Sequence, residues 1–238
     1  MDKAYFVGYR NITQQLLSVG FPEAKSIAIH IVDKYKNKIR LTDDELEIAK
    51  YLKNLLYSDT DDISINEGAI TRVFENTKED ICKMIEYLYR CGYSEGKVRS
   101  FYRKNPVALY CNDKEMKAIF EYLCSIGLNN EQVINVFLKA ICIGLENVKM
   151  RCEHVLKYFD ISVLYTLSQG YLFYLYYTDP IDAINYIVDK LGIEKSRDLL
   201  KEEDLFLYLW KEEWQRCDYV HGKQHKEALL IVEKYKRR

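Results

Sequence analysis

The side chains of this sequence that could bind a ligand are cationic, and they gather most densely between positions 97 and 104. Lys97, Arg99, Arg103 and Lys104 lie in this segment, together with Tyr102. Arg99 and Arg103 are four residues apart, so a helix would place both side chains on one face. Rows of cations bind a phosphate backbone, because each contact releases condensed counterions. The segment therefore predicts a nucleic-acid contact, with an ordinary solvated helix face as the alternative.

Two further basic clusters are present. The first comprises Lys34, Lys36, Lys38 and Arg40, with Tyr35 interleaved, and is a second candidate for backbone contacts. The other comprises Lys234, Lys236, Arg237 and Arg238, near the end of the sequence. Cations in the last turn of a helix interact favourably with the helix dipole, so we interpret this last cluster as a positive helix end.

The histidines, cysteines and carboxylates form no convincing catalytic or metal-binding pattern. His221 and His225 are four residues apart and Cys217 precedes them by one helical turn, which could supply metal ligands, but no fourth ligand accompanies them. The sequence has no glycine-rich phosphate loop, nucleophile elbow or H-E-x-x-H pair. Adjacent carboxylates such as Glu202 and Glu203 point to different helix faces. We predict no catalytic residues, no metal, no cofactor and no small-molecule substrate.

Aromatic residues provide the main alternative to a nucleic-acid ligand. The 21 tyrosines suit protein interfaces as well as helix packing. We interpret residues 171–177 as packing between helices rather than as a base-stacking platform. Trp210 and Trp214 are interpreted as core residues rather than as a docking patch. A protein-interaction module or inhibitor that holds a protein partner on a concave or aromatic surface stays open as the second hypothesis.

Composition excludes several other classes of protein. The 238 residues are 48% hydrophobic, which suffices for a core and is too apolar for a disordered chain. The formal net charge is −1, so any binding of anions must come from local clusters. The seven cysteines form no C-x-x-C pair and the first residues show no signal-peptide pattern, which together predict a cytoplasmic protein with reduced thiols. The apolar run 161–177 is interrupted by polar residues and is too short for a membrane span.

A repeat predicts the elements that must position these residues. Gly92, Gly127 and Gly192 each follow an apolar helical pattern, and Asp160 takes the corresponding position in the remaining unit. The steps between these four positions are 35, 33 and 32 residues. Such a period is typical of solenoids. We predict an all-α, right-handed solenoid of helical-hairpin repeats of about 32–36 residues, with short tight helical turns between the units.

Helix boundaries follow from capping residues and breakers. Second helices are predicted at 94–104, 130–139 and 194–201, with tails at 106–110, 141–145 and 205–209. Capping-box spacing is present in Thr42 with Glu45, Asn112 with Glu115, and Asn129 with Gln132. Glycines 92, 127 and 192 are expected to end helices in the left-handed conformation. Equivalent buried positions are predicted for Leu88, Leu123, Leu156 and Ile187.

We expect a single helical-repeat domain over residues 1–238. Residues 1–66 would form divergent repeats with an acidic loop at 59–66, residues 67–210 the clear repeats, and residues 211–238 a capping helix. Terminal repeats differ from central ones because they cap the stack with polar faces.

The segment around the first basic cluster resembles a known repeat family. Residues 91–99 read Cys-Gly-Tyr-Ser-Glu-Gly-Lys-Val-Arg, and residues 103–106 read Arg-Lys-Asn-Pro. Together with Leu109 and with residues 126–133 and 137–139 of the next unit, this pattern resembles the mitochondrial transcription termination factor (mTERF) family over residues 80–210. The resemblance implies an all-helical half-ring solenoid with a concave, basic face that binds nucleic acid. The sequence thus predicts a non-catalytic protein that contacts a nucleic-acid backbone.

Overall fold

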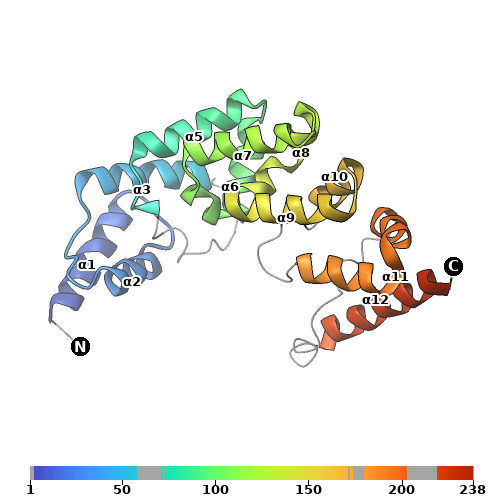
Figure 1. Ribbon diagram of the computed structural model, residues 1–238. Helices are drawn as coiled ribbons and strands as arrows, with labels where there is room; N and C mark the ends of the chain where they lie inside the picture. Colours follow the sequence, from blue (N-terminus) through green and yellow to red (C-terminus); the bar gives the residue numbers. More distant parts are fainter. Residues whose placement is uncertain are drawn as a thin grey trace. The chain divides into compact units, whose positions relative to one another are not determined.

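The computed structural model describes residues 3–57, 71, 73–170, 172–173, 180–202 and 219–237. Within these ranges the regular structure is helical and contains no strand, which confirms the all-α class (Figure 1). The chain divides into two compact units, Met1–Met116 and Lys117–Arg238. The expected divisions at residues 66 and 210 stay predictions, because both lie outside the described residues.

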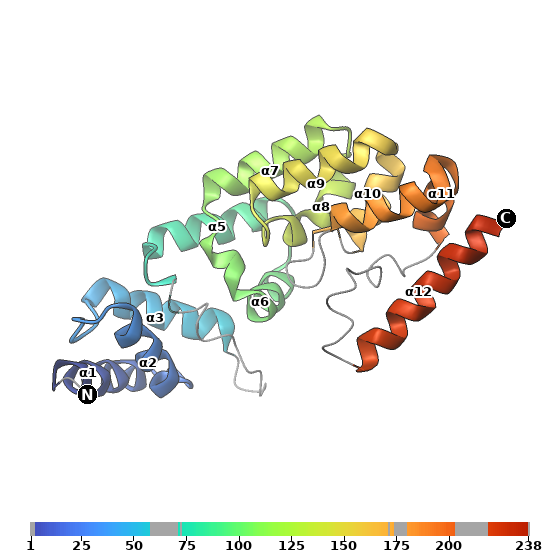
Figure 2. The same ribbon diagram turned by 60° about the horizontal axis from the view of Figure 1, so that its bottom comes forward.

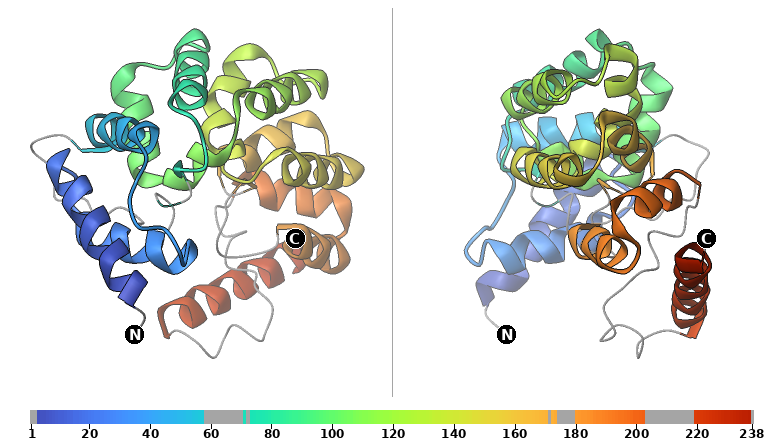
Figure 3. Two further views of the ribbon diagram at one scale, coloured as in Figure 1. Left: turned by 90° about the vertical axis from the view of Figure 1, so that its left-hand side faces the viewer. Right: turned by 45° about the vertical axis from the view of Figure 1, so that its right-hand side comes forward.

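The helices whose bounds the structure describes in the first unit are α-helices and one short 3-10 helix. They are α1 (Lys3–Ser18), α2 (Ala24–Lys34), α3 (Asp43–Leu56), α5 (Lys78–Arg90), α6 (Glu95–Lys104) and η1 (Pro106–Tyr110). Helix α1 packs beside α2 (Figure 3), and α3 contacts both α5 and α6. The predicted second helix at 94–104 is confirmed as α6 with Ser94 as its N-cap, and the predicted tight turn at 106–110 is confirmed as η1.

The second unit continues the pattern of hairpins. Its helices are α8 (Asn130–Ala140), α9 (Leu145–Tyr158), α10 (Ile161–Gln169), α11 (Pro180–Glu202) and α12 (Tyr219–Arg237), and α7 (Asp113–Ser125) leads into it. Helix α9 lies beside α11, and α8 contacts α10 (Figure 2). The predicted stop at Gly192 is confirmed by its φ of 75°, which breaks α11. At 141–145 the structure has an ordinary turn followed by the start of α9, whereas the predicted tail at 205–209 lies outside the described residues.

The second helices of three repeats share one register of buried residues. Their N-caps are Ser94, Asn129 and Asp160. The fourth, seventh and eighth residues after each N-cap are buried: Val98, Phe101 and Tyr102 in α6, Val133, Val136 and Phe137 in α8, and Leu164, Leu167 and Ser168 in α10. This spacing places the three positions on one helix face, so the same face of each second helix is turned toward the core.

The first helices follow the predicted register with one exception. Leu88, Leu123 and Ile187 are fully buried, as predicted. Leu156 is only half-buried, and Val155 occupies the core instead, so the prediction for Leu156 is wrong.

The end of α9 explains this exception. At the ends of α5 and α7 a glycine with positive φ allows the next residue to bond back into the helix, and the N–H of Leu128 donates to the carbonyl of Leu123 at 3.3 Å. Helix α9 has no such glycine, and Phe159 leaves the helix in an extended conformation. Leu88 and Leu123 lie four positions before Gly92 and Gly127, and the prediction takes the same distance before Asp160. Because α9 does not end in the same conformation, this distance leads to Leu156 and not to the buried Val155.

The capping box at the start of α3 supports a stability prediction. The N–H of Glu45 donates to the Thr42 hydroxyl at 3.3 Å, and the Thr42 N–H donates to the Glu45 carboxylate at 2.8 Å. Thr42→Ala should lower the free energy of unfolding by about 1 kcal/mol in urea denaturation, because a helix N–H loses its acceptor. Thr166→Ala, which changes an exposed threonine inside α10, is the control and should have an effect below about 0.5 kcal/mol. Equal effects of the two substitutions would contradict the prediction.

Candidate nucleic-acid interface

Helix α6 presents part of the predicted basic segment to solvent. Lys97 and Lys104 are exposed, and neither has a carboxylate partner among the residues that the structure describes. The Lys97 ammonium lies 5.0 Å from the centroid of the Tyr93 ring, an attraction that leaves the positive charge in place. Arg99 pairs with Glu95 at 2.8 Å, and its side chain is 42% exposed. Exposed pairs of this kind contribute little free energy, so a phosphate could compete for Arg99.

Two residues of the predicted site do not extend freely into solvent. Tyr102 is fully buried in the register described above, which corrects the expectation that its side chain contacts a ligand. Arg103 is half-buried, and its Nε donates to the carbonyl of Leu56 at 2.5 Å. Leu56 is the last residue of α3, whose final carbonyls lack partners within the helix. Arg103 therefore caps α3, and part of its hydrogen-bonding capacity is committed to the fold.

The cluster between positions 34 and 40 is largely neutralised by carboxylates of the same unit. Lys34 pairs with Glu75, whose carboxylate also accepts the Tyr35 hydroxyl at 2.8 Å. Lys38 pairs with Glu45. Lys36 and Arg40 are exposed and have no ion-pair partner within the described residues. This second cluster thus presents two available cations rather than four.

Arg90 is an available cation that the sequence analysis did not single out. It is exposed at the end of α5, and its guanidinium lies 5.8 Å from the Tyr87 ring centroid. The signal in the sequence is its place in the last helical turn, two residues before Gly92. Arg90 belongs to the same helical hairpin as Lys97, so this hairpin carries the candidate interface of the first unit.

In the second unit, hydrogen bonds to backbone carbonyls occupy two of the cationic side chains. Lys139 donates to the carbonyls of Gln169 and Gly170, and Arg151 donates to the carbonyl of Leu172 at 2.8 Å. Burial lowers the pKa of the Lys139 ammonium. Lys139 supplies a donor to the C-terminal end of α10, where helix carbonyls are otherwise unpaired, and Arg151 supplies one to a carbonyl just beyond that end. Their main role is therefore structural.

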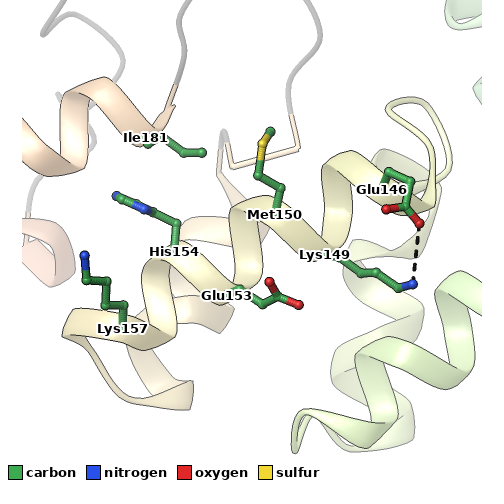
Figure 4. A pocket seen from close by; sticks show the side chains of 7 residues that line it. All are labelled: Glu146, Lys149, Met150, Glu153, His154, Lys157 and Ile181. Carbon is green, nitrogen blue, oxygen red and sulfur yellow. Dashed lines mark hydrogen bonds and ion pairs between the residues drawn. The ribbon is translucent and has the colours of Figure 1, made fainter.

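A shallow groove of about 430 Å³ runs along α9 (Figure 4). It is lined by Glu146, Lys149, Met150, Glu153, His154 and Lys157 of α9, and by Ile181 of α11. Met150 and Ile181 supply its apolar surface, and His154 Nε2 lies 3.0 Å from the side-chain oxygen of Asn185. The charges of the lining have both signs, and Glu146 pairs with Lys149 at 3.5 Å. A polyanion is a poor ligand for such a mixture, whereas a protein segment could use it.

Metal-binding and reactive groups are not assembled in the described part of the chain. No group of three or more His, Cys, Asp and Glu residues there is placed to hold a metal ion. Cys217 and the side chains of His221 and His225 lie outside the description, so the absence of a metal from them stays a prediction. Burial raises the pKa of the Cys142 and Cys152 thiols to about 12, which keeps both protonated at neutral pH.

None of the helices in the described ranges combines the length and the apolar composition that a membrane crossing requires. Residues 172–173 of the predicted aromatic packing segment are buried, while its other residues, together with Trp210 and Trp214, lie outside the described residues.

Much of the chain matches a known family of proteins. The family model mTERF matches residues 10–162, which run from α1 to the start of α10 and include the whole α5–α6 hairpin. The comparisons with curated proteins and with solved structures returned no match. The match covers more than half of the chain and agrees with the repeat of buried positions in α6, α8 and α10. The chain therefore belongs to the mTERF family of helical-repeat proteins, which generally bind nucleic acid and are not enzymes.

Proposed function

We propose that this protein binds nucleic acid without catalysis, through contacts between the α5–α6 hairpin and the phosphate backbone. The observation that carries the proposal is the uncompensated charge of α6, which has four cations and one carboxylate. Lys97 and Lys104 are its two exposed lysines, and both lack a carboxylate partner within the described residues. In a chain of net charge −1, such a local excess provides the electrostatic attraction that a phosphate backbone requires.

Helices α3 and α5, which contact α6, do not share this excess. Lys50 and Lys78 both pair with Glu47, and Lys83 pairs with Glu79. Helix α3 has two lysines against four carboxylates, and α5 has three cations against three carboxylates, so neither helix offers a polyanion a net positive charge. The contrast supports α6 as the binding helix more strongly than a count of lysines would.

Neutralising the two lysines tests the proposal. The double variant Lys97→Gln, Lys104→Gln should bind labelled single-stranded and duplex oligonucleotides about tenfold more weakly at low salt. The slope of log affinity against log salt should become shallower by about 2, because about one counterion is released per phosphate contact. Fluorescence anisotropy over a range of salt concentrations measures both quantities. Lys50→Gln with Lys83→Gln is the matched control, since it removes the same charge from paired positions of the same unit.

Three outcomes would count against the proposal. The first is no binding of either oligonucleotide by the wild-type protein at low salt. The second is binding whose affinity does not depend on salt. The third is an equal loss in the control variant, which would indicate that net charge matters rather than α6.

The groove on α9 supports a second candidate function, the binding of a protein partner. Its apolar Met150 and Ile181 are flanked by charges of both signs, which suits a protein surface better than a phosphate backbone. If Met150→Asp abolished co-purification of a defined partner while the Lys97 and Lys104 substitutions left it intact, this candidate would be favoured.

A further inference from the structure

An uncharged hydrogen-bonding cluster lies on the second unit, on helices α8 and α10. Asn135 of α8 and Gln169 of α10 are exposed, and Tyr165 of α10 lies half-buried between them. The Asn135 side-chain N–H donates to the Tyr165 hydroxyl at 3.3 Å, and the Gln169 side-chain N–H donates to the same oxygen at 2.8 Å. We call Asn135, Tyr165 and Gln169 the amide–tyrosine cluster.

Two residues of the cluster occupy repeat positions that carry arginines in α6. Tyr165 is the fifth residue after the N-cap Asp160, as Arg99 is the fifth after Ser94. Gln169 is the ninth residue after Asp160, as Arg103 is the ninth after Ser94. Because the buried positions four, seven and eight coincide in these helices, the fifth and ninth positions lie on corresponding sides of them. The side of the helix that carries Arg99 and Arg103 in α6 therefore carries Tyr165 and Gln169 in α10.

The hydrogen bonds within the cluster leave defined groups for a ligand. A tyrosine hydroxyl has two acceptor lone pairs and one donor, and the two amides use its acceptor side. Each side-chain amide keeps its carbonyl oxygen and one N–H, for which the described residues supply no partner. The hydrogen bonds to the Tyr165 hydroxyl also fix the orientation of the two amides. This reduces the conformational entropy that is lost when a ligand binds.

Electrostatics around the cluster permit a nucleic acid to approach. Helix α10 contains no charged residue between Ile161 and Gln169. The carboxylate of its N-cap, Asp160, is occupied by the N–H groups of Ser162 and Val163. Lys139 donates to the backbone carbonyl of Gln169, which places a positive charge beside this residue.

We propose that the amide–tyrosine cluster is a base-contacting subsite that binds the edge of an adenine. Side-chain amides of asparagine and glutamine pair with adenine in two hydrogen bonds, with the carbonyl accepting from N6 and the N–H donating to N7. The free carbonyl and N–H of Asn135 and of Gln169 match this pattern. This inference rests on the proposed function, in which the protein binds nucleic acid: phosphate contacts position a strand, and base contacts discriminate between bases.

The test compares two labelled single strands of equal length, oligo(dA) and oligo(dC). Asn135→Ala with Gln169→Ala should weaken oligo(dA) binding about tenfold, leave oligo(dC) binding unchanged, and leave the salt slope of both unchanged. Tyr165→Phe removes only the hydroxyl that orients the amides and should lower the oligo(dA) preference partially. Gln14→Ala, an exposed glutamine on α1, is the matched control and should have no effect.

The outcomes separate this inference from the proposed function. Equal losses for oligo(dA) and oligo(dC), or no loss for either, would overturn the adenine subsite even if the Lys97 and Lys104 variant behaves as expected. No binding of either strand by the wild-type protein would overturn both. Circular dichroism of each variant verifies that the helices are retained.

Discussion

Leu123→Ala should lower the free energy of unfolding by about 2–5 kcal/mol, the range found when a buried leucine is truncated. Leu123 is fully buried on α7, so the substitution removes apolar contacts and leaves a cavity. Its backbone carbonyl also accepts the N–H of Leu128, which closes the turn into α8. In a repeat protein a hairpin is stabilised by its neighbours, so a loss at this position weakens the adjoining repeats as well.

Urea denaturation followed by circular dichroism measures this loss. Leu17→Ala on α1 is the matched control, because the Leu17 side chain is 54% exposed, and it should change the free energy of unfolding by less than about 0.5 kcal/mol. A similarly small effect of Leu123→Ala would contradict the assignment of Leu123 to the core and, with it, the repeat register.

Gly127→Val should lower the free energy of unfolding by about 2–3 kcal/mol through backbone strain. Gly127 has a φ of 105°, a region that costs other residues about 1–2 kcal/mol and that β-branched residues adopt least readily. A Cβ atom there would lie 3.7 Å from the nearest atom of Ile161, an ordinary contact, so steric clash is not the cause. The same measurement applies as for Leu123.

Gly96→Val provides the control for this second prediction. Gly96 lies in α6 without a positive φ, and a Cβ atom there would meet nothing within 4 Å. The control should change stability by less than about 1 kcal/mol, the range of helix propensities. If Gly127→Val were as mild, the left-handed turn between α7 and α8 would not be a source of stability.

Much of the fold could be predicted because its signals are local. Thr42 with Glu45 and Asn129 with Gln132 form the capping boxes that their spacing indicates. The positive φ at Gly127 is likewise a consequence of one residue type at a helix end. These features depend on interactions between residues three to five positions apart, so their residue types are visible in the sequence.

The candidate site was less predictable, because contacts between distant residues decide which cations remain available. Arg99 and Arg103 look equivalent in the sequence, yet Arg103 caps α3 by a bond to Leu56, 47 positions away. Lys34 is paired with Glu75, 41 positions away. No periodicity indicates either partner, since both depend on how the helices pack.

The sequence by itself determined the helical class, the period of the repeat and the ends of most helices, because each follows from local propensity and from apolar spacing along one helix. Tertiary structure alone decided that Tyr102 belongs to the core, that Arg103 is committed to α3, and that Lys97 and Lys104 keep their charge available. The physical reason is that burial and ion pairing depend on which surfaces meet. A helix that carries polar residues on several faces leaves that choice to the helices packed against it.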